Sequence, residues 1–110
     1  MANLIDACRP YSFAFNGLDL MEGGPQRAEL EAEFNECAEA LRLLLCEELK
    51  KPATTTWKEI RTLAGWRTNM PDTDQDIRYN FAVSVQLSPE AAELCERLEL
   101  IRSKITGALL

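Results

Sequence analysis

The segment between residues 23 and 52 constrains the fold most, because it has the pattern of one long helix with both ends marked. A glycine pair at 23–24 interrupts regular structure, Pro25 suits a first helical position, and Pro52 cannot continue a helix. Between them, apolar residues recur three and four positions apart, at Leu30, Phe34, Cys37, Leu41, Leu44, Leu45 and Leu49. The predicted helix would be about 38 Å long. In a chain of 110 residues, we expect part of that length to need a partner, either a second copy or another protein.

Two further helices follow from local end signals. A capping box, Thr56–Glu59, starts a short helix, and Gly65 suits its end. The last helix has Ser88 as N-cap and Pro89 at its first position, and it runs toward residue 107. Its apolar stripe consists of Ala91, Leu94, Cys95, Leu98, Ile101 and Ile105.

The rest of the regular structure is predicted to be β. An Asn-Gly pair at 16–17 lies between alternating apolar runs, which predicts a hairpin with strands Tyr11–Phe15 and Leu18–Met21. Ile77–Leu87 alternates and is rich in β-branched and aromatic residues, which predicts a strand. We therefore expect a single α+β domain over residues 1–110. Its small antiparallel sheet, formed by the hairpin and strand 77–87, is packed by two long amphipathic helices and one short helix.

Composition argues against most catalytic and metal chemistry. The chain has no histidine, and its four cysteines form no C-x-x-C pair, so we expect buried reduced thiols, no metal site and no cofactor. Asp72, Asp74 and Asp76 have the spacing of a calcium loop. The sixth and twelfth places of that loop hold Ile77 and Val83, where Gly and Glu are needed. The glutamates lie on the outward faces of the predicted helices. We expect no enzyme activity.

Charge and hydropathy bear on location and partners. The net charge is −6, which repels nucleic acid and favours basic partners. No apolar run approaches the roughly 20 residues of a membrane-spanning helix. The first residues lack the basic region and long apolar stretch of a secretory signal. We expect an intracellular, cytoplasmic protein that does not insert into a membrane.

Residues 51–70 give one alternative function, because they are basic and partly match a helix-turn-helix. Their net charge is +3, and Ile60, Gly65 and Trp66 fit that motif. Pro71 and the aspartates after it do not suit a recognition helix. The alternative is a small nucleic-acid-binding regulator, or a binder of a small molecule or nucleotide at the same patch. The residues of this basic aromatic patch are Trp57, Lys58, Arg61, Trp66 and Arg67.

Our main hypothesis is a non-enzymatic acidic module, a probable homodimer, that binds a protein with a basic surface. Rows of carboxylates on a helix can imitate a phosphate backbone, as in small inhibitors from phages and mobile elements. Such a module would occlude the basic surface of a nucleic-acid-handling protein complex. The predicted contact residues on the long helix are Glu29, Glu33, Glu36 and Glu39.

Overall fold

Five helices make up the regular structure in the described part of this protein. A computed structural model of the chain describes residues 1–66 and 71–110. The helices are α1 (Leu4–Leu20), α2 (Pro25–Glu48), α3 (Trp57–Leu63), α4 (Asp72–Ser84) and α5 (Pro89–Leu109).

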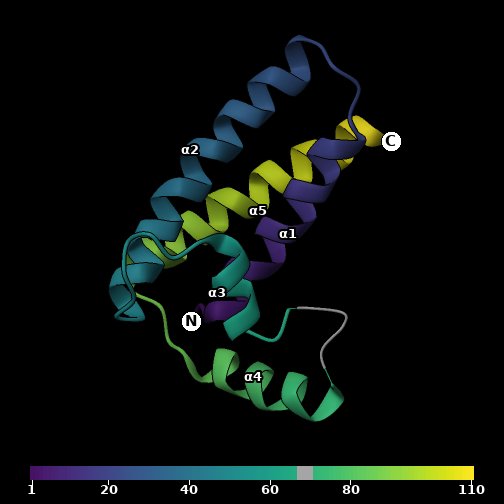
Figure 1. Cartoon of the computed structure of the whole chain (residues 1–110). Helices are drawn as coiled ribbons and strands as arrows, with labels where there is room; N and C mark the ends of the chain where they lie inside the picture. Colours follow the sequence, from purple (N-terminus) through teal and green to yellow (C-terminus); the bar gives the residue numbers. More distant parts are fainter. Residues whose placement is uncertain (67–70) are drawn as a thin grey trace.

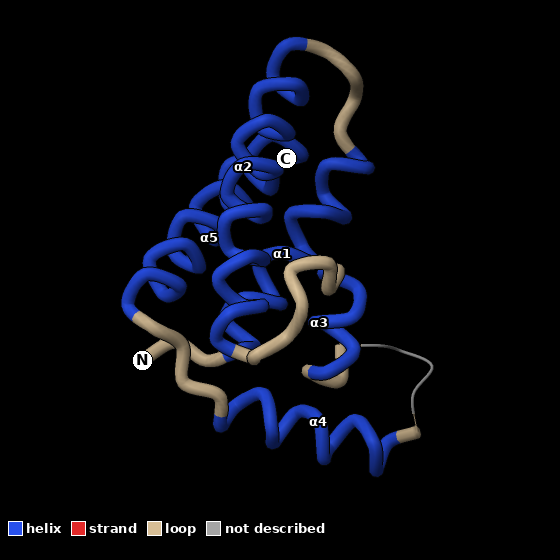
Figure 2. The backbone as a smooth tube through the Cα atoms, turned by 60° about the vertical axis from the view of Figure 1, so that its left-hand side comes forward, coloured by secondary structure: helices blue, strands red, loops and turns tan. Residues whose placement is uncertain are grey.

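The helices α1, α2 and α5 form a three-helix bundle, and α3 and α4 lie at one end of it (Figures 1 and 2). The largest fully buried aliphatic side chains come from α1, α2, α3 and α5, and they are Leu4, Leu41, Leu45, Ile60, Leu98 and Ile105. Burying such a side chain contributes about 1.5–3 kcal/mol. The core therefore belongs to the bundle and α3, whereas Ala82 is the one buried residue that α4 supplies.

The predicted starts of α3 and α5 are confirmed. Thr56 and Glu59 form the reciprocal capping box of α3. The Ser88 hydroxyl oxygen caps α5 by accepting from the backbone N–H of Ala91 at 3.2 Å. The carboxylate of Glu48, at the end of α2, accepts from the Ser88 N–H at 2.7 Å and from its hydroxyl at 3.0 Å. This contact joins the end of α2 to the start of α5.

The predicted N-terminal hairpin is wrong, because residues 11–21 belong to α1 and its C-cap. The Asn3 side chain caps this helix in a capping box with Asp6. Its buried residues follow a helical period, as at Leu4, Cys8, Tyr11 and Leu18. Gly17 lies inside the helix because of packing: a Cβ there would stand 2.7 Å from the Ile105 Cγ2 atom of α5. The Asn-Gly pair therefore serves a close helix–helix contact.

The predicted strand 77–87 is also wrong, because residues 72–84 form α4. Pro71 precedes α4, and Asp72 and Asp74 in its first turn suit the helix dipole. In residues 1–66 and 71–110, the one trace of extended pairing is an isolated bridge between Asn3 and Gln86. The described residues contain five helices and no sheet, so the predicted α+β class is replaced by an all-helical fold.

The Gly17 contact generates a stability prediction. Gly17→Ala and Gly107→Ala each replace a glycine inside a helix, so both gain about the same intrinsic helix propensity, up to ~1 kcal/mol. A Cβ at Gly107 meets nothing within 4 Å, whereas one at Gly17 clashes with Ile105. We expect Gly17→Ala to unfold with a free energy about 1–3 kcal/mol lower than Gly107→Ala. Urea unfolding followed by circular dichroism measures this difference, and equal values would contradict the rigid contact.

Candidate functional site

The helix α4 carries the most unusual surface in the described part of the chain. Its four large apolar side chains are all well exposed: Ile77 by 63%, Tyr79 by 48%, Phe81 by 47% and Val83 by 45%. Single exposed apolar residues are normal on protein surfaces. Four of them on one helix of 13 residues form a patch that core packing does not explain.

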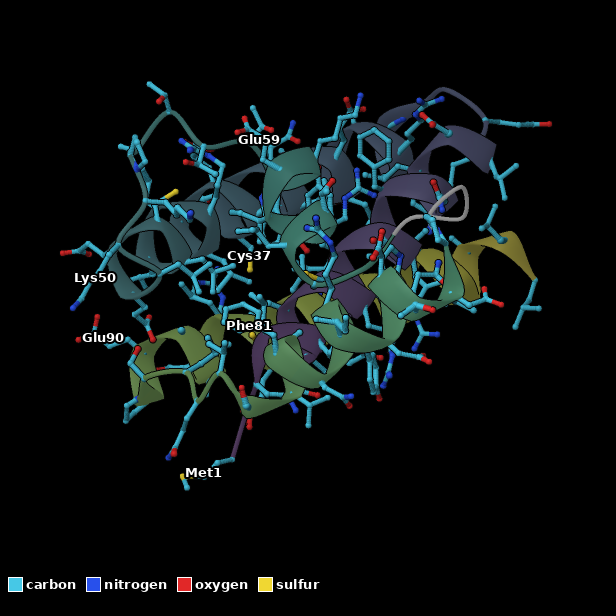
Figure 3. All side chains as sticks on the ribbon, turned by 60° about the horizontal axis from the view of Figure 1, so that its bottom comes forward. Met1, Cys37, Lys50, Glu59, Phe81 and Glu90 are labelled. Carbon is cyan, nitrogen blue, oxygen red and sulfur yellow. The ribbon has the colours of Figure 1, made fainter. Side chains whose placement is uncertain are left out.

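The inner side of α4 contacts the rest of the protein. Ala82 is fully buried. The Arg78 guanidinium donates to the Thr62 carbonyl at 3.0 Å. A Cβ at Gly65 would stand 3.0 Å from the Gln75 carbonyl oxygen, so the turn after α3 lies directly against the α4 backbone. Figure 3 brings this end of the molecule forward and shows no other helix in front of α4, with Phe81 at its side.

The start of α4 adds negative charge to this surface. Asp72, Asp74 and Asp76 are exposed. Asp72 and Asp76 are four positions apart and lie along one side of the helix, whereas Asp74 points to another side, so the three carboxylates do not converge on one ion. In residues 1–66 and 71–110, no cluster of ligating side chains could hold a metal. The cation of this helix, Arg78, is turned inward to Thr62. The surface of α4 therefore carries exposed apolar side chains along the helix and carboxylates at its first turns.

The basic aromatic patch predicted from the sequence is not assembled as a surface. Trp57 is 7% exposed, its indole N–H donates to the Ala38 carbonyl at 3.0 Å, and its ring stacks on Tyr11 at 4.2 Å between centroids. Trp57 is therefore part of the core. Lys58 is exposed on α3, and Arg67 lies outside the described residues.

The remaining two patch residues are directed toward α1. The Arg61 guanidinium lies 5.2 Å from the centroid of the Tyr11 ring and donates weakly to the Ser12 hydroxyl at 3.4 Å. Trp66 is partly buried and meets Phe13 edge to face, with 6.4 Å between ring centroids. These contacts join the α3 region to α1.

The acidic residues predicted on α2 are partly neutralised. Glu33 pairs with Lys104 of α5 at 3.4 Å. Glu39 pairs with Arg42 at 2.6 Å, and the hydrogen bond from Arg42 lowers the pKa of the Glu39 carboxyl. Glu36 is exposed and lines a groove with Arg97, and Glu29 is exposed near the start of the helix. The α2 surface therefore offers less unpaired charge than the sequence suggested.

All four cysteines are buried and unpaired, as predicted. Burial raises the pKa of the Cys8 and Cys95 thiols to about 12 and also raises that of Cys37. A thiol with so high a pKa stays protonated at neutral pH, and the thiolate is the nucleophile. The three cysteines act as small apolar residues where α1, α2 and α5 meet.

Comparison with protein-family models, curated proteins and solved structures found no match to this chain. Within residues 1–66 and 71–110, no helix is long and apolar enough to cross a bilayer. Support for a function therefore comes from the surface of the protein. The exposed apolar helix α4 is a part of that surface that the sequence did not predict. The alternation of Ile77, Tyr79, Phe81 and Val83 predicts one face of a strand, so the sequence gives no signal for an exposed helix here.

The cysteine pKa values predict a loss of stability in alkali. Below pH 9 the thiols are protonated in both states and contribute nothing. Between about pH 9 and 12, unfolded thiols ionise while those of Cys8 and Cys95 stay protonated. The free energy of unfolding should then fall by up to ~1.4 kcal/mol per pH unit for each thiol. Urea unfolding across this range should show a shallower fall in Cys8→Ala/Cys95→Ala, and an unchanged slope would contradict the assignment.

Proposed function

We propose that this protein is a non-enzymatic protein-binding module that contacts its partner through α4. The observation that carries the proposal is the exposure of Ile77, Tyr79, Phe81 and Val83 on a helix that supplies one buried residue, Ala82, to the core. Each side chain is about half exposed, so together they present roughly 400 Å² of apolar surface on the two sides of one helix, in the range of the largest apolar patches on monomeric proteins, which are often functional.

Charge indicates the class of partner. Asp72, Asp74 and Asp76 extend from the same helix as the apolar side chains, and the whole chain carries a net charge of −6. A partner with a basic surface would be attracted and oriented by this field. The most specific form of the proposal is occlusion of the basic surface of a nucleic-acid-handling protein complex. The exposed Glu29 and Glu36 of α2 would add to the attraction at longer range.

The predicted homodimer stays a prediction. The apolar stripes of α2 and α5, which could have formed its seam, are occupied inside the protomer, since Leu41, Leu45, Leu98 and Ile105 are fully buried. A homodimer would therefore have to form through another surface of the protein.

The proposal predicts a selective loss of binding. The variant Tyr79→Ser/Phe81→Ser removes two exposed rings from α4, and Leu100→Ser removes a 63% exposed leucine from α5. We expect the α4 variant to lose at least about tenfold in affinity, because buried aromatic contacts dominate interfaces, and the α5 variant to bind like wild type. The measurement is quantitative mass spectrometry of proteins recovered on the tagged full chain from the source cell's lysate.

Two controls make this result decisive. Circular dichroism must show the same helix content and melting temperature in both variants, because all the altered side chains are exposed. Half of each lysate is treated with nuclease, and we expect recovery to persist. Recovery that requires nucleic acid, or equal recovery by wild type and the α4 variant, would contradict the proposal.

A further inference from the structure

The apolar side chains of α4 form two pairs on nearly opposite sides of the helix. Ile77 and Phe81 are four positions apart, as are Tyr79 and Val83, so each pair lies along one side. At 3.6 residues per turn, the two pairs are separated by about 160° across the outer face of the helix. All four side chains are exposed. The structure therefore presents two apolar flanks, which we define as the 77/81 flank and the 79/83 flank.

A ridge of small polar side chains separates the flanks on the outside. Asn80 and Ser84 are exposed there, and the Ser84 hydroxyl donates to the Phe81 carbonyl at 2.6 Å. On the inside, Arg78 and the buried Ala82 hold the helix to the protein. A partner that contacts both flanks must reach around the ridge on its two sides.

The area available decides between a flat and a concave partner. A flat surface laid against one flank would cover about half of the apolar patch, roughly 200 Å². A specific interface buries about 800 Å² on each partner. A cleft that encloses the outer half of a helix about 20 Å long covers both flanks and the ridge, which brings the contact toward that size.

Charge excludes a second copy of this chain as the occupant. Two α4 helices packed in parallel would bring Asp72, Asp74 and Asp76 against the same residues of the other copy. Packed antiparallel, the aspartates would meet the negative end of the other helix dipole. No Lys or Arg occurs between residues 79 and 96 to offset this, and Glu90 adds further negative charge. Both arrangements place like charges together, so the occupant has to be a different, basic protein.

We infer that α4 inserts as a helix into an apolar cleft of its partner, and that Lys or Arg side chains line the end of the cleft that receives Asp72, Asp74 and Asp76. The inference rests on the proposed function and adds the mode of contact and the shape of the partner. The cleft contacts the 77/81 flank and the 79/83 flank together.

Site-specific photo-crosslinking in the full chain tests this geometry. Benzoylphenylalanine replaces one residue at a time, at Ile77, Phe81, Tyr79 or Val83, and at Leu100 of α5 as a control of equal exposure to Ile77. The tagged chains are expressed in the source cell, irradiated and purified under denaturing conditions. We expect all four α4 positions to yield a covalent product with the same protein, identified by mass spectrometry, and Leu100 to yield none.

A charge-reversal variant tests the basic end of the cleft. Asp72→Lys/Asp74→Lys/Asp76→Lys alters three exposed residues. We expect recovery of the cross-linked protein on the tagged chain at low salt to fall roughly tenfold or more, and the difference from wild type to shrink as salt screens the charges. Unchanged recovery at low salt would show that the cleft has no Lys or Arg side chains that receive the three aspartates.

The other outcomes separate the inference from the proposed function. Products from one flank alone would show a flat contact and overturn the cleft. A product of twice the chain's own mass would show that a second copy occupies α4. If a partner is recovered in the pull-down but is not cross-linked from α4, the protein is a protein-binding module that contacts its partner through another surface, and the inference about α4 is wrong. Failure to recover any partner would overturn the proposed function as well.

Discussion

The close packing of α1 on α5 is the contact on which the rest of the structure depends. Gly17 lets the two helices approach until an added Cβ would stand 2.7 Å from Ile105. This approach also brings Cys8 and Cys95 into the core, where burial keeps their thiols protonated. With α2 packed against α5 and the rings of Tyr11 and Trp57 stacked, the bundle and α3 supply most of the core, and α4 adds only Ala82 to it.

Because most of the core lies outside α4, core packing does not explain the exposed apolar residues of this helix. Ala82 alone of this helix is buried, so the stability of the core does not depend on Ile77, Tyr79, Phe81 or Val83. Large apolar side chains in water carry a risk of aggregation and contribute little to folding where they stand. A helix that is held at its inner side and apolar on both flanks suits a function outside the protomer.

Local signals predicted α2, α3 and α5, whereas α1 and α4 were predicted as β-structure, and tertiary packing explains these errors. The Thr56–Glu59 capping box and the Ser88-Pro89 start are short-range features, so the sequence alone was enough to place α3 and α5. The Asn-Gly pair at 16–17 has a strong hairpin preference, but its meaning here depends on Ile105, which lies far along the chain. The alternation in residues 77–87 favoured a strand, and nothing local showed that its apolar side chains would stay exposed. The burial of Trp57 likewise depends on Ala38 and Tyr11, so its place in the core could not be predicted from residues 51–70.

The aspartates of α4 oppose the self-association that its exposed apolar flanks would otherwise favour. Exposed apolar helices tend to pair with copies of themselves, and flanking charges of one sign oppose that association. Asp72, Asp74 and Asp76 stand at one end of the helix, and no cation between residues 79 and 96 can pair with them in another copy. The same carboxylates would be attracted to a cleft that ends in Lys or Arg. One set of charges therefore opposes self-association and orients α4 in its partner, so the apolar flanks can supply affinity while the aspartates supply selectivity.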